Sequence, residues 1–137
     1  MSYIHLYKGS PTSGAADGTL VSEGDGSSPI TLGPLNATSN EESSALKLGI
    51  RCETGYVSAA DVVITPTGTT AAKWALAPDN GGTPGTFGAY GAALTITSVI
   101  NATNTIFWVK AKATSGETPA NDTSVDLVVT CATVNPA

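Results

Sequence analysis

The chain is poor in charge and in histidine, and it has no long apolar run. Its 137 residues include 6 Lys and Arg, 11 Asp and Glu and one His. Charged residues make up 12% of the chain, about half of the ~25% in an average globular protein. A net charge of −5 with so few basic residues argues against a nucleic-acid partner. No apolar run approaches the ~20 residues of a membrane span, so no membrane partner is expected.

Cysteine and aromatic residues are also scarce, whereas small and turn-forming residues are abundant. The chain has 2 Cys, 15 Gly and 8 Pro, and 41% of its residues are hydrophobic. That hydrophobic fraction excludes a solvated, disordered chain. One domain of this length buries roughly two-thirds of its surface on folding, so neither a metal nor a disulfide is needed to form a core. The composition favours strands and turns over helices.

Short β-favouring runs are separated by clusters of Gly, Pro, Asn and Ser, which predicts an all-β fold built as one antiparallel β-sandwich. The expected extended runs are 3–8, 19–22, 29–32, 44–53, 61–65, 73–77, 92–100, 104–114 and 123–133. Apolar and polar residues alternate most clearly in 44–53, 104–114 and 123–133. We expect the run 61–65 to stop at Pro66, segment 78–85 to be irregular, and the last two runs to pair as a long hairpin. No convincing helix is found.

The chain divides into an extended N-terminal segment and a sandwich core within one domain. Residues 1–43 are expected to form a strand or arm with irregular loops that pack on the sandwich, which covers 44–137. The first run, 3–8, could pair within its own sheet or reach over a neighbouring molecule, because an open strand edge is a ready pairing surface.

Cys52 and Cys131 both fall on the predicted inward faces of their strands. A disulfide between them would close a long loop and stabilise the fold by about 2–4 kcal/mol. Two free thiols that pack as small hydrophobic groups fit the same pattern. The sequence leaves both interpretations open.

No residue pattern predicts a reaction, so no catalytic residue, metal or cofactor is expected and the chain is not expected to be an enzyme. His5 is the only histidine, and no nucleophile motif accompanies it. Asp17, Glu23 and Asp25 lie in Gly-rich stretches and are interpreted as solvated turn residues, since no calcium-loop pattern contains them.

The aromatic residues suggest contacts with other molecules. Trp108 shares a strand face with Lys110 and Lys112, opposite the apolar series of the same strand. It either packs on neighbouring loops or contacts another subunit, because exposed Trp is enriched at interface hot spots. The candidate interface residues are Tyr3, Ile4, Leu6, Tyr7, Phe87, Tyr90 and Trp108.

From Ser44 onward the pattern resembles an immunoglobulin-like (Ig-like) β-sandwich. A cysteine-bearing strand is followed by a strand with Trp74 and then by the long C-terminal runs. The sequence departs from antibody domains because Cys131 falls in the last predicted strand and an extra strand precedes Trp74. The resemblance implies an Ig-like architecture and carries no function with it.

The whole chain is similar to small structural proteins of tailed bacteriophages, of the head-decoration or tail type. The similarity rests on small size, a start without a secretory leader, acidic balance, Thr/Gly/Ala-rich strands and the segments 104–112 and 124–129. It implies a non-enzymatic virion protein, made in the host cytoplasm, that forms homo-oligomers and contacts other virion proteins. The alternative is a carbohydrate- or cell-surface-binding module in which Trp108, Tyr90 and Asp79 or Asn80 contact a glycan.

Overall fold

The computed structural model describes residues 3–21, 45–67, 71–112, 126–131 and 133–136, and these form an all-β fold. The strands are β1 (Ile4–Lys8), β2 (Thr19–Val21), β3 (Leu46–Cys52), β4 (Tyr56–Ser58), β5 (Val62–Thr67), β6 (Trp74–Asn80), β7 (Thr83–Pro84), β8 (Leu94–Ile96), β9 (Thr105–Ala111), β10 (Asp126–Cys131) and β11 (Val134–Pro136). A 3-10 turn, η2 (Ala71–Lys73), precedes β6, and the described residues contain no α-helix.

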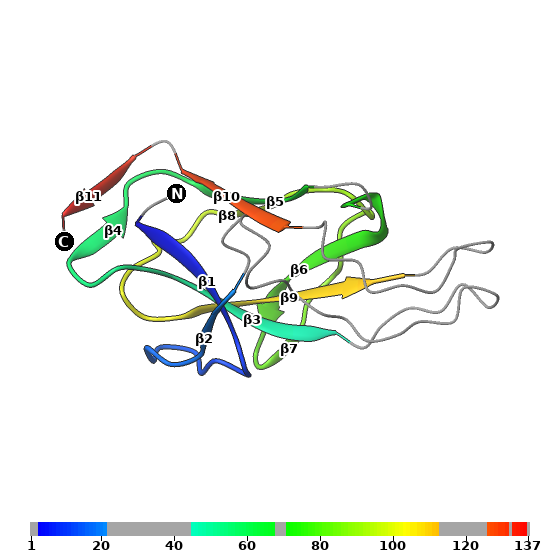
Figure 1. Ribbon diagram of the computed structural model, residues 1–137, viewed down its shortest axis with the longest axis horizontal. Coiled ribbons are helices and arrows are strands. Elements are labelled where there is room, and N and C mark those ends of the chain that lie inside the picture. Colours follow the sequence, from blue (N-terminus) through cyan, green and yellow to red (C-terminus); the bar gives the residue numbers. More distant parts are fainter. Residues whose placement is uncertain (1–2, 22–44, 68–70, 113–125, 132, 137) are drawn as a thin grey trace.

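The strands form three antiparallel sheets. The largest has the order β2-β1-β3-β9-β6-β7, the second has the order β10-β5-β8, and β11 pairs with β4 in a short third sheet. In Figure 1 the three-stranded sheet runs along the top of the molecule above the six-stranded sheet, and the β4–β11 pair lies at the left end.

One hydrophobic core lies between the two larger sheets. It contains residues from both of them and Ile100 from the segment before β9: Ile4, Leu6, Leu48, Ile50, Cys52, Trp74, Leu76, Phe107, Val109 and Ala111 from the six-stranded sheet, and Val62, Ile64, Leu127, Val129 and Cys131 from the three-stranded sheet. Where the structure describes the runs 44–53, 104–114 and 123–133, the predicted alternation is confirmed: every second residue of β3, β9 and β10 points into this core.

The predicted hairpin between the last two long runs is wrong. β9 is a central strand that pairs with β3 and β6, whereas β10 pairs with β5 in the other sheet. Both strands have one strongly apolar face, and each face reaches the shared core from its own side. The sequence pattern fixes the inward face of each strand but not the neighbour with which it pairs.

The predicted end of the run 61–65 is also wrong. β5 continues through Pro66, which pairs with Leu127 of β10. A proline is tolerated there because the β8 register ends at Ile64, so Pro66 lies beyond the part of β5 that has neighbours in register on both sides. Proline therefore does not terminate this strand.

The segment 78–85, predicted to be irregular, contains a tight hairpin. β6 extends to Asn80, which pairs with Thr83 of β7 across the two-residue turn Gly81-Gly82. The φ angles of these glycines are 65° and 94°, as a type I′ turn requires. The glycines that suggested irregular structure are therefore the residues that allow the backbone to reverse.

Candidate functional site

The basic residues of the chain all belong to the six-stranded sheet or directly flank its strands. They are Lys8, Lys47, Arg51, Lys73, Lys110 and Lys112. The three-stranded sheet contains no Lys or Arg, so the positive charge of the molecule is concentrated on one side of the fold.

Two of these lysines join aromatic rings in what we call the aromatic–lysine cluster: Phe87, Tyr90, Trp108, Lys110 and Lys112. The ammonium nitrogen of Lys110 lies 4.7 Å from the centre of the Phe87 ring and 5.7 Å from that of Tyr90. The ammonium nitrogen of Lys112 lies 4.3 Å from the centre of the Tyr90 ring. These distances are within the ~6 Å range of cation–π attraction. All five side chains are partly exposed.

The backbone places this cluster by laying a glycine-rich loop along β6. The N–H groups of Gly85, Gly88 and Gly91 donate to the carbonyls of Pro78, Leu76 and Trp74, at 2.8, 3.0 and 2.7 Å. Gly91 has φ +87°, and a Cβ atom there would lie 3.2 Å from Cα of Ala72. A glycine is therefore required at this close approach, and the loop holds Phe87 and Tyr90 against β9.

Trp108 is fixed by a hydrogen bond from Nε1 to Oδ1 of Asp79 at 2.9 Å. Lys47 of β3 and Ala77 of β6 lie opposite Trp108 in the sheet register. The other carboxylate oxygen of Asp79 accepts a hydrogen bond from the Gly82 N–H at 3.3 Å. The structure thus brings together Trp108 and Asp79, two of the residues that the glycan alternative names, and places Tyr90 beside the neighbouring lysines.

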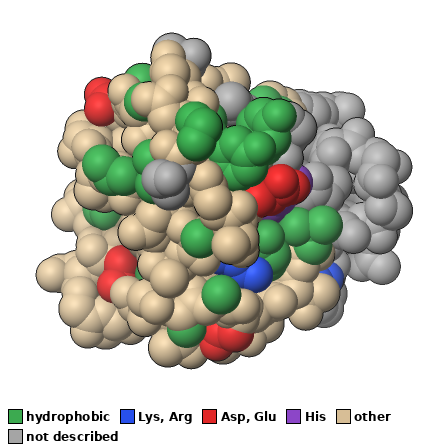
Figure 2. All heavy atoms as spheres, turned by 90° about the vertical axis from the view of Figure 1, so that its left-hand side faces the viewer, with side chains coloured by type: hydrophobic (Ala, Val, Ile, Leu, Met, Phe, Trp, Pro, Cys, Tyr) green, Lys and Arg blue, Asp and Glu red, His purple; other side chains and the backbone are tan. Residues whose placement is uncertain are grey.

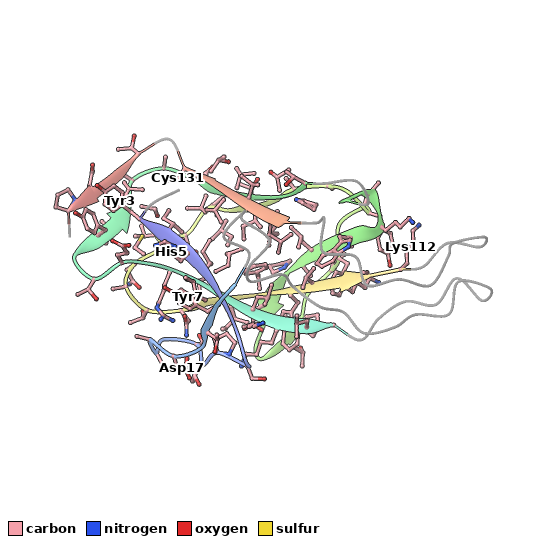
Figure 3. The ribbon with its side chains drawn as sticks, viewed as in Figure 1. Tyr3, His5, Tyr7, Asp17, Lys112 and Cys131 are labelled. Carbon is pink, nitrogen blue, oxygen red and sulfur yellow. The ribbon has the colours of Figure 1, made fainter. Side chains whose placement is uncertain are left out.

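Apart from the aromatic–lysine cluster, a row of polar and aromatic contacts lies along β1. Tyr3 stacks on Tyr56 with ring centres 4.5 Å apart. The His5 ring and Glu53 are 3.1 Å apart. Figure 3 shows Tyr3, His5 and Tyr7 in sequence along β1. Figure 2 views this end of the molecule, where the histidine lies beside an acidic side chain and apolar side chains lie above and below the pair.

Tyr7 ends this row beneath the guanidinium group of Arg51, whose central carbon lies 3.5 Å from the ring centre. The two remaining candidates from this strand, Ile4 and Leu6, do not lie on the surface: each is 2% exposed and belongs to the core. Alternation along β1 accounts for the difference. Tyr7 of β1 and Tyr3, which directly precedes the strand, are therefore at least partly exposed. β1 is built into its own sheet between β2 and β3.

The loop between β1 and β2 is anchored by Asp17, for which the sequence predicts only a solvated turn. Its carboxylate accepts hydrogen bonds at 2.8 Å from the Thr12 N–H, the Thr12 hydroxyl and Nδ2 of Asn104. These bonds lower the pKa of Asp17, those from Thr12 most strongly. Buried Asn104 and the guanidinium of Arg51 complete the network, which no sequence motif indicates.

Cys52 and Cys131 are both free and buried. The Cys52 thiol donates to the Ile100 carbonyl at 3.4 Å, and the Cys131 thiol to the Thr133 carbonyl at 3.2 Å. Burial and the nearby Cys131 thiol raise the pKa of Cys52. The structure thus shows the thiol form and brings the two groups within electrostatic range of each other. Glu23 and Asp25 lie outside the described residues.

His5 contacts Glu53, whose side chain is half exposed, so this pair lies at the surface of the fold. No group of three or more His, Cys, Asp or Glu suited to hold a metal ion occurs in the described part of the chain. Nor does any helix there have the length and apolar character to cross a membrane.

Comparisons with known proteins found no match: no family model, curated protein or solved structure is similar to the chain. The arguments for its function therefore come from its own residues.

Proposed function

We propose that the protein is a non-enzymatic structural component of a phage particle, acting by self-association and by contacts with other virion proteins. The observation that carries this proposal is the aromatic–lysine cluster. It combines partly exposed Trp, Tyr and Phe rings with lysines whose ammonium groups lie over the Phe87 and Tyr90 rings. Aromatic residues are enriched at protein–protein interfaces, and hot spots are rich in Trp and Tyr. In this proposal the cluster is the contact surface.

An Ig-like sandwich is the architecture that we propose for this component. The order β1-β3-β9-β6 corresponds to strands A-B-E-D of the Ig constant type, and the adjacent β10 and β5 correspond to F and C. Cys52 then lies on B and Cys131 on F, because β11 follows β10. The fold departs from that type in three places: β2 and β7 extend the first sheet at its two edges, β8 occupies the other side of β5, and β11 pairs with β4.

The low charge of the chain suits a durable assembly. Contacts formed by aromatic rings and neutral polar groups depend little on ionic strength, whereas contacts between exposed charges are screened by salt. We therefore expect self-association that persists at high salt. A protein that forms part of the coat or tail of a particle works through its contacts and needs no catalytic centre.

The test is sedimentation analysis of the full-length protein over a wide concentration range, combined with mass spectrometry of purified particles from the source culture. We expect a concentration-dependent oligomer, weakened in the Phe87→Ala/Tyr90→Ala double variant. Val99→Ala serves as the matched control, because Val99 is 63% exposed and lies outside the cluster. A protein that stays monomeric at every concentration and is absent from the particles would overturn the proposal.

A glycan-binding module is the second candidate, and one observation favours it. Trp108 is oriented by the Asp79 carboxylate, and an aromatic ring fixed beside a hydrogen-bond acceptor can stack on a sugar and bind its hydroxyl groups. A glycan array with the full-length protein tests this candidate. Binding that is lost in Trp108→Ala and kept in Val99→Ala would support it, and the absence of any binding would remove it.

A further inference from the structure

The hairpin that carries Asp79 ends in a chemically reactive pair of residues. Asn80 is the last residue of β6 and is followed directly by Gly81, and this is the only Asn-Gly step in the sequence. Asn80, Gly81 and Gly82 are all exposed. Because glycine has no side chain to hinder it, its backbone nitrogen can approach the preceding asparagine more closely than that of any other residue.

The structure does little to restrain this pair. The hairpin has two register pairs, Asp79 with Pro84 and Asn80 with Thr83, and proline contributes no N–H to the ladder. A Cβ atom at Gly81 or Gly82 would meet no heavy atom within 4 Å. The side-chain amide of Asn80 and the Gly81 N–H form no hydrogen bond with the described residues. Local opening of such a short hairpin needs little free energy.

We propose that Asn80 is a site of spontaneous deamidation. The Gly81 backbone nitrogen attacks Cγ of Asn80, a new bond forms between these two atoms, the bond between Cγ and Nδ2 of Asn80 breaks, and ammonia leaves with the proton from Gly81. Water then opens the resulting cyclic imide at one of its two carbonyls. The products are aspartate, or isoaspartate with the backbone running through the former side chain. Water is the only co-reactant, and no electrons are transferred.

The reaction alters the support of Trp108. Isoaspartate adds a methylene to the backbone between Asp79 and the turn, so the Asn80–Thr83 pair and the bond from the Thr83 hydroxyl to the Asn80 carbonyl are lost. The bond from the Gly82 N–H to Asp79 depends on the same turn. Asp79 then holds the Trp108 indole less firmly. The modification itself does not depend on the proposed function, whereas its effect on assembly rests on that proposal.

The test is incubation of the purified full-length protein in mildly alkaline buffer, followed by proteolysis and mass spectrometry with enzymatic detection of isoaspartate. We expect conversion at Asn80 within about a hundredfold of the rate in the denatured protein, as local opening allows. Asn101 is the control inside the same sample, because its side-chain oxygen accepts bonds from the N–H and hydroxyl of Thr103 and alanine follows it. An Asn80 peptide that stays intact in the native protein while the denatured protein is converted would overturn the proposal.

Two variants separate the reaction from its consequence. Asn80→Ser removes the reacting amide and should abolish the conversion, whereas Asn80→Asp supplies the new charge without the added methylene. In the spectrum of indole N–H resonances, isoaspartate should shift the Trp108 signal and leave that of buried Trp74 in place. An unmoved Trp108 signal after full conversion would refute the coupling to Trp108. Sedimentation of the converted protein tests the assembly function separately.

Discussion

The side-chain amide of Asn104 donates a hydrogen bond of 2.8 Å to the carboxylate of Asp17, 87 residues earlier in the sequence. Asn104 also donates to the Thr12 carbonyl at 3.1 Å and accepts a bond from Arg51 at 2.8 Å. Its backbone pairs with the same loop through Gly14 and Ala15. A single residue that is 4% exposed thus connects the start of β9 to the loop between β1 and β2.

We expect Asn104→Ala to lower the free energy of unfolding by about 2–4 kcal/mol. The substitution removes the bonds of the Asn104 amide to Asp17, Thr12 and Arg51, and a hydrogen bond contributes about 0.5–1.5 kcal/mol, or about 1.5–3 kcal/mol when one partner is charged. Chemical denaturation of the full-length protein measures the effect. Asn101→Ala is the control, because Asn101 is exposed and its side chain bonds to nearby Thr103. Equal losses in the two variants would contradict the role given to Asn104.

Gly49→Ala should destabilise the protein, although alanine normally suits a strand better than glycine. A Cβ atom at Gly49 would lie 3.0 Å from Oδ1 of Asn104 and 3.0 Å from Cγ of Pro11. Both neighbours are buried, so the loop must shift, and such overpacking costs about 1–3 kcal/mol.

Gly88→Ala is the matched control for Gly49→Ala. Its Cβ atom would make ordinary contacts, at 3.9 Å with the Leu76 carbonyl and 4.0 Å with Ala92. We expect its midpoint of thermal unfolding to stay close to that of the parent protein. A Gly49→Ala variant as stable as Gly88→Ala would show that Pro11 and Asn104 leave room for a Cβ atom at position 49 of β3.

The sequence predicts the β class and the inward faces of β3, β9 and β10, because a period of two in apolar residues reports burial directly. It does not predict the partners of β9 and β10, because the apolar pattern of one strand does not identify the strand with which it pairs. Two predictions based on proline and glycine are wrong: the strand does not end at Pro66, and the segment around Gly81 is not irregular. A proline at a free edge and glycines in a type I′ turn both occur within regular β structure.

The candidate site is only partly predictable. Trp108 is expected as a contact residue from its residue type and strand face, and Phe87 and Tyr90 from their residue type in a Gly-rich loop. The structure adds that Lys110 lies against both rings of the loop. The anchoring role of Asp17 could not be predicted, because its partner Asn104 is distant in sequence and buried asparagines have no local signature. The inward alternation that identifies the core also argues against Ile4 and Leu6 as surface residues.

Asp17 should contribute a dependence of stability on acid pH. Its pKa in the folded protein is lowered from the usual 3.8 by bonds from Thr12 and Asn104. The folded state therefore binds the proton less tightly than the unfolded state, so this stabilisation is present above pH 3.8 and is lost as the pH falls through the lowered value. Asp17→Asn should flatten that part of the stability curve. Asp61→Asn is the control, because no hydrogen bond to its carboxylate occurs among the described residues, and an equal flattening there would contradict the assignment.

Cys52 should make the stability of the fold depend on pH in the alkaline range. Burial and the neighbouring Cys131 raise its pKa above the usual 9.0. The folded protein then holds the thiol proton more tightly than the unfolded protein, so this stabilisation is complete below pH 9.0 and is lost as the pH rises through the raised value. Alkylation of Cys52 in the native protein should accordingly be slow, because the reactive thiolate is rare and the sulfur is buried. In Cys131→Ala one cause of the raised pKa is removed, so the pH profile of Cys52 alkylation should move toward lower pH. A profile that does not move would show that burial alone sets the reactivity of Cys52.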